Sequence, residues 1–323
     1  TMMTTSEYTS EVEKVIKDLA LGRRTPEALY QPIEYALSAG GKRLRPVLTL
    51  MACQAFGGGY TPALKAAAGI EMFHNFTLLH DDVMDNSSTR RGRASVYARF
   101  GTDTAILSGD TMLTLATQLV SEVPDTQLRR VLDVFNTMAI EVYEGQQLDL
   151  SFEHRADITL EEYIKMIGQK TGALLGASLK IGAIIGGASD RDADYMYEFG
   201  MMLGLAFQIQ DDWLDTFGDA STFGKPIGGD IANGKKTYLY IMAMNRGGSD
   251  SQLFATAMAL EQPELRIKTV TRLLEKMGIA EECRKAVASY SSKALSALKR
   301  TTLGDEAKDA LRKVAEKLIG RKK

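Results

Sequence analysis

The chain has almost no net charge, few cysteines and no long uninterrupted apolar run. Its 323 residues carry a formal net charge of −2, so no excess of positive charge indicates nucleic-acid binding. The two cysteines, Cys53 and Cys283, are too few for a disulfide framework, which favours a cytoplasmic protein. The longest apolar stretch, residues 173–185, is interrupted by Gly176 and Lys180. It therefore falls short of a membrane span, which needs about 18 apolar residues or more.

Proline is scarce in the middle of the chain, and strand patterns are missing. No proline lies between Pro124 and Pro226, where Ala, Leu, Met, Glu, Gln and Lys are abundant. These residues favour helix. A sheet would be indicated by a series of short segments in which apolar and polar residues alternate, bounded by turn residues. The sequence contains no such series. The sequence therefore predicts an all-α protein.

Local signals suggest where helices begin and end. Thr159–Glu162 reads as a capping box that opens a helix running to Thr171. Residues 218–234 are too polar and glycine-rich for a helix. Length alone suggests about two domains, but no break resembles an interdomain linker. We therefore expect one domain over residues 1–323, a bundle of roughly ten or more helices.

An acidic motif occurs twice. The first copy is Asp81-Asp82-Val83-Met84-Asp85 and the second is Asp211-Asp212-Trp213-Leu214-Asp215, each directly after an apolar segment. On a helix the first and last aspartates of each copy share one face, one turn apart. Carboxylates gathered on apolar segments repel one another and lose hydration unless cations neutralise them. Such oxygen ligands suit Mg²⁺ or Mn²⁺, and Mg²⁺ usually completes its shell with water and substrate phosphate. The motif therefore predicts metal-assisted chemistry on a phosphorylated substrate.

Basic residues accompany the first acidic motif. Arg90 and Arg91 follow it closely, and Gly40–Pro46 (GGKRLRP) holds further cations beside two glycines and a proline that predict a turn. The planar guanidinium of arginine binds two phosphate oxygens at once. His74 lies two helical turns before Asp81. The chain thus combines carboxylates that can hold metal with cations that can bind phosphate directly.

Together these segments resemble the trans-isoprenyl diphosphate synthase family. The matching segments follow in the family's order: GGKRLRP, LLHDDVMDNSSTRRG, KTG, FQIQDDWLD and FGKPIGGDI with GKKTY. One acidic pentad is a weak signal, whereas two copies with an arginine pair after the first are specific. The resemblance covers nearly the whole chain. It implies the isoprenoid synthase type I fold, an all-α bundle around a central cavity, and assembly as a homodimer.

The resemblance implies a Mg²⁺-dependent head-to-tail (1′-4) condensation by a prenyltransferase. An allylic diphosphate loses pyrophosphate, isopentenyl diphosphate attacks the allylic cation through its double bond, and a proton then leaves. About three Mg²⁺ ions per active site are implied. Their direct ligands would be Asp81, Asp85 and Asp211. The residues that act indirectly on the metal would be Asp82, Asp212 and Asp215.

The same resemblance assigns roles to further residues. The side chains that hold the allylic diphosphate would be Arg90, Lys170, Lys225 and Lys235. Those that hold isopentenyl diphosphate, without metal, would be Lys42, Arg45, His74 and Arg91. The catalytic dipoles that stabilise the carbocation would come from Lys170, Thr171 and Gln208. The roles of two further residues stay open. Asp149 would either join the metal's water shell or cap a helix end, and Lys236 would be only a solvated neighbour of Lys235.

Phe76 is the candidate for the residue that limits product length. It lies about 7.5 Å along the helix from Asp81, beside the small Thr77. In the family a bulky aromatic residue here stops elongation early, and a single one resembles synthases that stop at geranylgeranyl diphosphate. We therefore expect a C20 product, with farnesyl diphosphate (C15) next. Alternatively Phe76 is plain core, as aromatic residues on apolar helix faces usually are.

Three other functions stay open at this point. A class I terpene synthase would cyclise a prenyl diphosphate, but it has no use for a second, metal-free diphosphate site at Lys42, Arg45 and Arg91. A non-catalytic subunit of a heteromeric synthase would be expected to carry degenerate acidic motifs, and both copies here are intact. A metal-dependent phosphohydrolase would release phosphate without forming a carbon–carbon bond.

Overall fold

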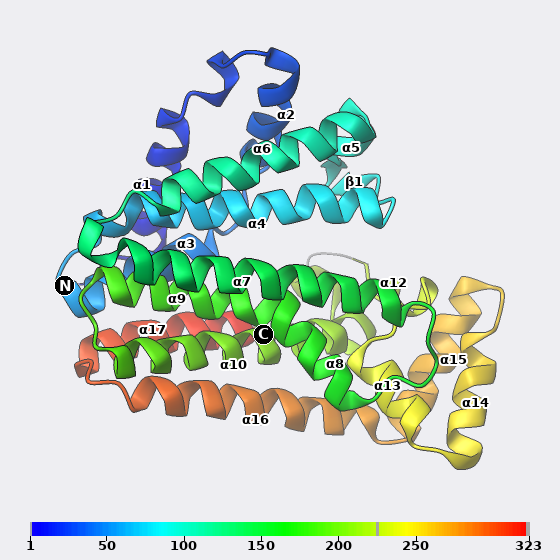
Figure 1. Ribbon diagram of the computed structural model, residues 1–323. Helices are drawn as coiled ribbons and strands as arrows, with labels where there is room; N and C mark the ends of the chain where they lie inside the picture. Colours follow the sequence, from blue (N-terminus) through cyan, green and yellow to red (C-terminus); the bar gives the residue numbers. More distant parts are fainter. Residues whose placement is uncertain (1, 224–225, 321–323) are drawn as a thin grey trace. The chain divides into compact units, whose positions relative to one another are not determined.

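The computed structural model describes residues 2–223 and 226–320, and helices dominate it (Figure 1). The predicted all-α class is confirmed. Within the described residues the only sheet is a pair of two-residue strands, and no helix is both long and apolar enough to cross a membrane. The chain divides into two compact units, which are described separately below; the single-domain assignment stays a prediction.

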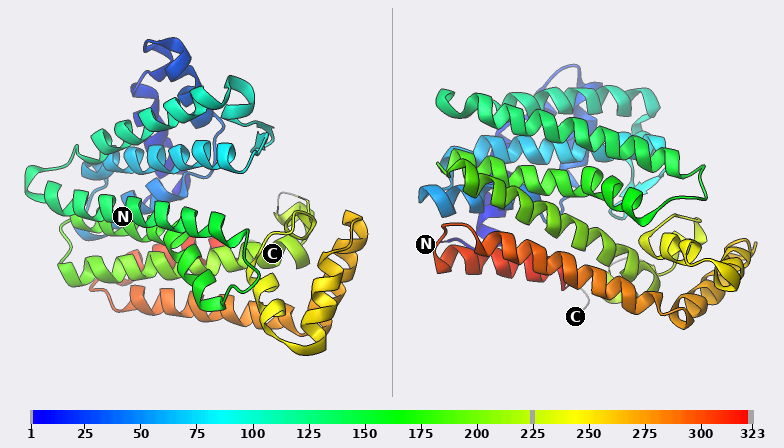
Figure 2. Two further views of the ribbon diagram at one scale, coloured as in Figure 1. Left: turned by 45° about the vertical axis from the view of Figure 1, so that its right-hand side comes forward. Right: turned by 60° about the horizontal axis from the view of Figure 1, so that its bottom comes forward.

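The first unit consists of Thr1–Asn136, Ala177–Asp194 and Thr302–Ala307. Within it α4 packs against α6, and the two run side by side in both views (Figures 1 and 2). Its complete elements are α1 (Thr5–Asp18), η1 (Leu21–Arg23), α2 (Glu27–Ser38), α3 (Leu44–Gly57), η2 (Thr61–Ala63), α4 (Leu64–Met84), β1 (Thr89–Arg90), β2 (Arg93–Ala94), α5 (Val96–Phe100) and α6 (Thr102–Val120).

Helix α4 carries the first acidic motif out of the core of this unit. Its residues from Ala66 to Phe73 are all buried, as expected for a helix that is apolar on every side. Towards its C-terminal end the buried positions become sparser, and the helix ends at Asp85. Asn86 follows with a φ of 52°, a left-handed conformation that asparagine tolerates better than most residues. The aspartates are therefore presented where the helix leaves the core.

The second unit consists of Thr137–Gly176, Tyr195–Thr301 and Lys308–Lys323. Its core is built on residues of α10 (Asp190–Phe217) such as Ile209, Trp213 and Leu214. Helices α14 and α15 pack against each other within it. Its elements are α8 (Leu160–Ile167), the π-helical η3 (Gly168–Gly172), α11 (Ala220–Phe223), α12 (Gly229–Ala232), α13 (Tyr238–Asn245), α14 (Gly248–Met258), α15 (Pro263–Lys276) and α16 (Ile279–Lys299).

Four helices contribute residues to both units. They are α7 (Asp125–Phe152), α9 (Ala173–Ile185), α10 (Asp190–Phe217) and α17 (Asp305–Ile319). The second acidic motif lies on the part of α10 that belongs to the second unit.

Some local predictions are confirmed and others are wrong. Thr159 is the N-cap of α8 and accepts from the backbone N–H of Glu162, but the Glu162 carboxylate pairs with Arg155 rather than returning to the cap. The predicted helix does reach Thr171, but it changes from α-helical to π-helical after Ile167. Residues 218–234 were expected to be non-helical, yet they contain the one-turn helices α11 (Ala220–Phe223) and α12 (Gly229–Ala232).

Candidate active site

The first acidic motif occupies the C-terminal end of α4. Asp82 is 3% exposed, whereas Asp81 is partly buried and Asp85, the C-cap residue, is exposed. The two carboxylate oxygens of Asp82 accept hydrogen bonds of 2.8 Å each from Nε and Nη2 of Arg90. A bidentate arginine–carboxylate pair is among the strong hydrogen bonds. The middle aspartate is therefore committed to Arg90, and the outer two lie nearer to solvent.

Arg90 and Arg91 belong to a hairpin with a two-residue loop. Strand β1 (Thr89–Arg90) pairs antiparallel with β2 (Arg93–Ala94), and the loop residues Arg91 and Gly92 have φ values of 53° and 78°. Two successive positive φ values match the type I′ turn that such hairpins prefer. Glycine adopts this conformation without strain, whereas arginine does so at a cost. The Arg-Arg-Gly motif is therefore partly a turn signal and partly a binding signal.

A group of cations surrounds His74 in the first unit. Burial lowers the pKa of His74 well below its usual range, and the charges of Arg45, Arg91, Arg90 and Arg43 lower it further. His74 is therefore neutral at pH 7 and can bind an anion only through its ring N–H. Burial also lowers the pKa of Arg45 and of Arg91.

The structure thus brings together three of the four residues predicted to hold isopentenyl diphosphate. The fourth, Lys42, is exposed in the loop before α3. The same loop supplies a carbonyl to the group, because Nη1 of Arg91 donates to the Gly40 oxygen at 2.6 Å. A Cβ added to Gly41 would lie 3.1 Å from the Arg91 guanidinium carbon. Both glycines have positive φ, so they allow the loop to pass close under Arg91.

Glu71 of this group was not predicted from the sequence, and Arg43 was noted only as one of the cations of GGKRLRP. Glu71 is 3% exposed; burial raises its pKa, and Arg43, Arg45 and Arg91 act against that shift. The Arg43 guanidinium is also buried, 3.7 Å from a Glu71 carboxylate oxygen and 2.6 Å from Glu13. Glu71 is thus a buried counter-charge beneath the arginines. The available signal was a single glutamate within the apolar part of α4.

The second acidic motif lies on α10 in the second unit. Asp212 is 1% exposed and accepts from the Tyr163 hydroxyl, from the Tyr238 backbone N–H at 3.0 Å and from Nε2 of Gln208 at 3.2 Å. Burial raises the pKa of Asp212, and the Lys235 charge and these donors oppose that shift. Gln208, predicted to face the carbocation, is therefore also a donor to the middle aspartate.

The outer aspartates of the second motif differ from each other. Asp215 is 3% exposed and accepts from the backbone N–H of Asp230 at 2.8 Å. Asp211 is partly buried. Asp215 is thus more buried than Asp211. The indirect role that the resemblance implies for Asp215, and the direct role that it implies for Asp211, stay predictions.

Lys235 and Lys170 neutralise acids in the second unit. Although burial lowers the pKa of Lys235, the nearby charges of Asp212, Asp230 and Asp149 outweigh it, and the net pKa is raised. Nζ of Lys170 lies 2.7 Å from an Asp149 oxygen. Asp149 is therefore an ion-pair partner of Lys170 rather than a helix cap. Both lysines lie among carboxylates of the second unit.

Lys170 and Thr171 lie in the π-helical turn Gly168–Gly172. Such turns often occur at functional sites because they shift side chains and carbonyls out of the regular helical register. A Cβ added to Gly145 of α7 would lie 2.6 Å from the Lys170 backbone nitrogen. Gly145 therefore allows α7 to pack directly against this turn.

Lys236 is not merely a solvated neighbour of Lys235. Its ammonium donates to carbonyl oxygens at the C-terminal end of α7, at 2.8 Å to Phe152 and 3.3 Å to Glu153, and it also contacts Arg155. A lysine in this position satisfies carbonyls that have no partner within the helix. Lys225, the remaining residue predicted to hold the allylic diphosphate, lies outside the described residues.

Phe76 is a core residue of the first unit. It is 5% exposed, and its ring centroid lies 5.4 Å from that of Phe73 and 5.0 Å from that of His80. Thr77, four residues before Asp81, shares the helix face of that aspartate more closely than Phe76 does. The packing of Phe76 is compatible with a wall that limits the length of the prenyl product. This role of Phe76 stays a prediction.

The less buried outer aspartates of each motif fit a magnesium site that is completed by substrate. Among residues 2–223 and 226–320 no group of three or more His, Cys, Asp or Glu side chains could hold a metal alone. Mg²⁺ is usually bound through one or two carboxylates plus substrate phosphates and water. Asp81 and Asp85 in the first unit, and separately Asp211 in the second, can supply such carboxylates, because each is less buried than the middle aspartate of its motif. These outer aspartates of each motif therefore suit Mg²⁺ that arrives with a diphosphate.

Comparisons with known proteins identify the family of this chain. Residues 26–277 match the polyprenyl synthetase family. A short chain isoprenyl diphosphate synthase of Methanothermobacter thermautotrophicus is 36% identical over 298 residues, covering 92% of this chain and 91% of that protein. A geranylfarnesyl diphosphate synthase of Aeropyrum pernix is 34% identical over 307 residues, covering 93% and 96%. A crystal structure of a geranylgeranyl pyrophosphate synthase matches with a TM-score of 0.94 and 40% identity, covering 100% of both chains.

Proposed function

Because this chain belongs to the polyprenyl synthetase family and is an isoprenyl diphosphate synthase, we propose that it joins isopentenyl diphosphate head-to-tail to an allylic diphosphate. The observation that carries this proposal is the cationic group of Arg45, Arg91 and neutral His74 in the first unit. These residues offer a diphosphate site built without metal-binding carboxylates. A terpene cyclase, which has one diphosphate substrate, does not need it.

The two acidic motifs would hold the metal that the family typically uses. Asp81 and Asp85 of the first unit and Asp211 of the second would supply carboxylate oxygens to Mg²⁺. Bound Mg²⁺ neutralises the charge that develops on the departing pyrophosphate. The number of ions, about three per active site, is part of the proposal.

Side chains of this protein would bind and orient the allylic diphosphate. The side chain of Arg90 is 36% exposed. Its N–H groups that are not bonded to Asp82 can therefore reach a phosphate. Lys170 and Lys235 keep positive charge among the acids of the second unit. Lys225 would join them. Backbone dipoles of the π-helical turn Gly168–Gly172, together with Thr171 and Gln208, would stabilise the allylic cation.

The product is proposed to be C20, with Phe76 as part of the wall that stops growth. Its ring is locked between Phe73 and His80, so a growing chain could not displace it easily. The relatives are named for products of different length, and C15 is the next candidate. A cytoplasmic location and a homodimer are further expectations; light scattering on the purified protein tests the second.

Product analysis tests the proposed reaction. The protein is incubated with Mg²⁺, labelled isopentenyl diphosphate and, separately, C5, C10 and C15 allylic diphosphates, and the dephosphorylated products are sized by chromatography. Accumulation of C20 alcohol from every primer supports both the condensation and the length. A C15 stop, or chains of C25 or more, contradicts the assigned length but not the reaction. Pyrophosphate release without incorporation of label contradicts the condensation.

A further inference from the structure

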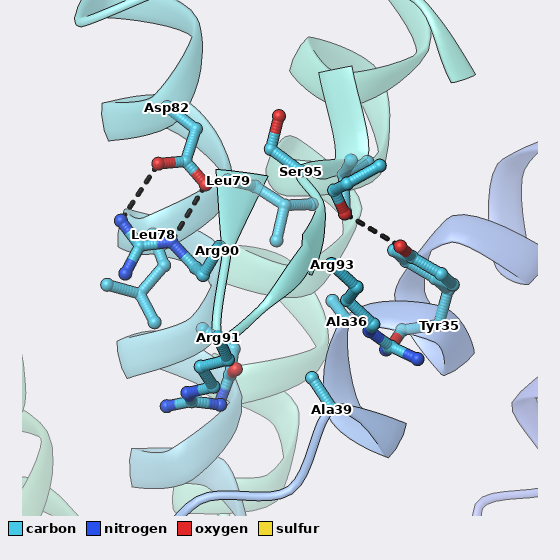
Figure 3. Close-up of a pocket in the computed structure, with 13 residues that line it drawn as sticks. Tyr35, Ala36, Ala39, Leu78, Leu79, Asp82, Arg90, Arg91, Arg93 and Ser95 are labelled. Atoms are coloured by element: carbon cyan, nitrogen blue, oxygen red, sulfur yellow. Dashed lines mark hydrogen bonds and ion pairs between the residues drawn. The ribbon is translucent and has the colours of Figure 1, made fainter. Parts of the chain in front are cut away.

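The hairpin that presents Arg90 and Arg91 is too short to be stable by itself. Each strand has two residues, and an isolated two-stranded hairpin is marginal even when it is longer. Its loop also contains Arg91 in a strained conformation, with a φ of 53°. Contacts from other elements must therefore hold it in place. Figure 3 shows this hairpin between α4 and α2.

The two arginines of the motif are held by different contacts. Arg90 is fixed from α4 by its bidentate bond to Asp82. Arg91 instead donates a hydrogen bond to the Gly40 carbonyl in the loop that follows α2. The position of Arg91 thus depends on how the hairpin lies relative to α2 and that loop.

Tyr35 of α2 makes the contacts that fix β2 to α2. Its hydroxyl donates to the Ala94 carbonyl at 2.7 Å. Its ring lies under two guanidinium groups, with the Arg93 carbon 3.8 Å and the Arg99 carbon 4.5 Å from the ring centroid. Arg93 also reaches back to α2, donating to the Tyr35 carbonyl and, at 3.1 Å, to the Ser38 hydroxyl. One tyrosine therefore binds the strand through both its ring and its hydroxyl (Figure 3).

We propose that Tyr35 is a positioning residue for isopentenyl diphosphate binding, acting through Arg91. It fixes β2 on α2, and the two-residue loop then sets Arg91 beside Arg45 and His74. The inference rests on the proposed function, because it concerns the site assigned to isopentenyl diphosphate. Tyr35 itself touches no substrate in this account. Arg90 is affected less, because Asp82 holds it from the other side.

Steady-state kinetics of Tyr35→Phe and Tyr35→Leu test the proposal. Tyr35→Phe keeps the ring beneath the guanidinium groups and loses only the bond to Ala94, so a rise of about threefold in KM for isopentenyl diphosphate is expected. Tyr35→Leu loses this bond together with the ring contacts to Arg93, Arg99 and Phe100, and it is expected to raise this KM about tenfold or more. The kcat and the KM for the allylic diphosphate should change less than about twofold. Tyr30→Phe is the matched control, since Tyr30 lies on the same helix and its ring contacts Arg24 instead.

A double-mutant cycle with Arg91→Ala separates positioning from general loosening. If Tyr35 acts through Arg91, Tyr35→Leu leaves the KM for isopentenyl diphosphate unchanged when Arg91 is already absent. An equal rise in both backgrounds would overturn the proposal. So would a Tyr35→Leu protein that has a lower Tm and an unchanged KM, since that is the result of a purely structural role. If the unmodified protein incorporates no isopentenyl diphosphate, the proposed function fails instead.

Discussion

The middle aspartates of the two acidic motifs are both buried, but they are neutralised by different means. Asp82 in the first unit is paired with a charged partner, Arg90, whose side chain is 36% exposed. Asp212 in the second unit is hydrogen-bonded to the neutral hydroxyl of Tyr163, a backbone N–H and the amide of Gln208, and Lys235 adds a nearby positive charge. The same sequence pattern thus rests on a bidentate ion pair in one unit and on neutral hydrogen-bond donors with a nearby lysine in the other.

Because both middle aspartates are buried, each motif depends on more than its two outer aspartates. A buried carboxylate without partners is costly, so each middle aspartate requires its own donors. In the first motif these donors fix the helix turn that carries Asp81 and Asp85. In the second motif they fix the turn that carries Asp211. We infer that the middle positions support the site and the less buried outer positions face the metal.

Metal removal is expected to have the largest effect. Chelation of Mg²⁺ should lower the condensation rate by about 10³-fold or more, because the leaving pyrophosphate loses its neutralising cations. Since no described group of three ligands closes around a metal, Mg²⁺ alone should raise the Tm little, whereas Mg²⁺ with pyrophosphate should raise it clearly. Thermal unfolding with each addition measures this. A large shift with Mg²⁺ alone would contradict the view that substrate completes the site.

Alanine substitutions should reveal the difference between the middle aspartates. Asp212→Ala leaves buried donors from Tyr163 and Tyr238 without a partner and should reduce the free energy of unfolding by about 3 kcal/mol. Asp82→Ala should cost only about 1 kcal/mol, because the partly exposed Arg90 can be rehydrated. Urea unfolding measures both. Asp133→Ala is the surface control, since Asp133 pairs with an exposed Arg129. Equal losses at Asp82 and Asp212 would refute the comparison.

The cationic group of the first unit predicts a pH dependence. His74 has a lowered pKa when folded, so as the pH falls below about 6.5 the unfolded chain gains a proton that the folded protein resists. Stability should therefore fall with decreasing pH, by at most about 1.4 kcal/mol per pH unit. His74→Gln should remove this part of the slope, and the exposed His154 supplies the control His154→Gln. An unchanged slope in His74→Gln would show that His74 is not the group responsible.

The smallest effect concerns backbone strain at Arg91. Arg91→Asn and Arg91→Val both remove the guanidinium, but asparagine accepts a positive φ and a β-branched residue does not. The Val variant should be less stable than the Asn variant by about 1 kcal/mol. Both should bind isopentenyl diphosphate more weakly. Comparable stability of the two variants would mean that the loop is not strained.

The sequence was sufficient for the features that local chemistry determines. The long proline-poor stretch predicted the all-α class, and the two intact acidic pentads predicted metal-assisted chemistry on a phosphorylated substrate. The isoprenyl diphosphate synthase itself was implied by the resemblance that these motifs and GGKRLRP carry. What it could not show depends on contacts between distant residues. The Tyr163–Asp212 bond joins positions 49 apart and the Tyr35–Ala94 bond joins positions 59 apart, and neither leaves a local pattern. Likewise, Lys236 looks like a surface lysine until its bonds to the end of α7 are seen.

The most direct test of the account measures four asparagine variants side by side: Asp81→Asn, Asp82→Asn, Asp211→Asn and Asp212→Asn. Each is assayed for Mg²⁺-dependent incorporation of isopentenyl diphosphate and for Tm. We expect Asp81→Asn and Asp211→Asn to lose about 10²-fold or more in rate with little change in Tm, because these carboxylates are less buried. Asp82→Asn and Asp212→Asn should lower the Tm, and Asp212→Asn should do so more. If the outer variants keep their activity while the middle ones lose it without any loss of Tm, the assignment of roles within the motifs is wrong.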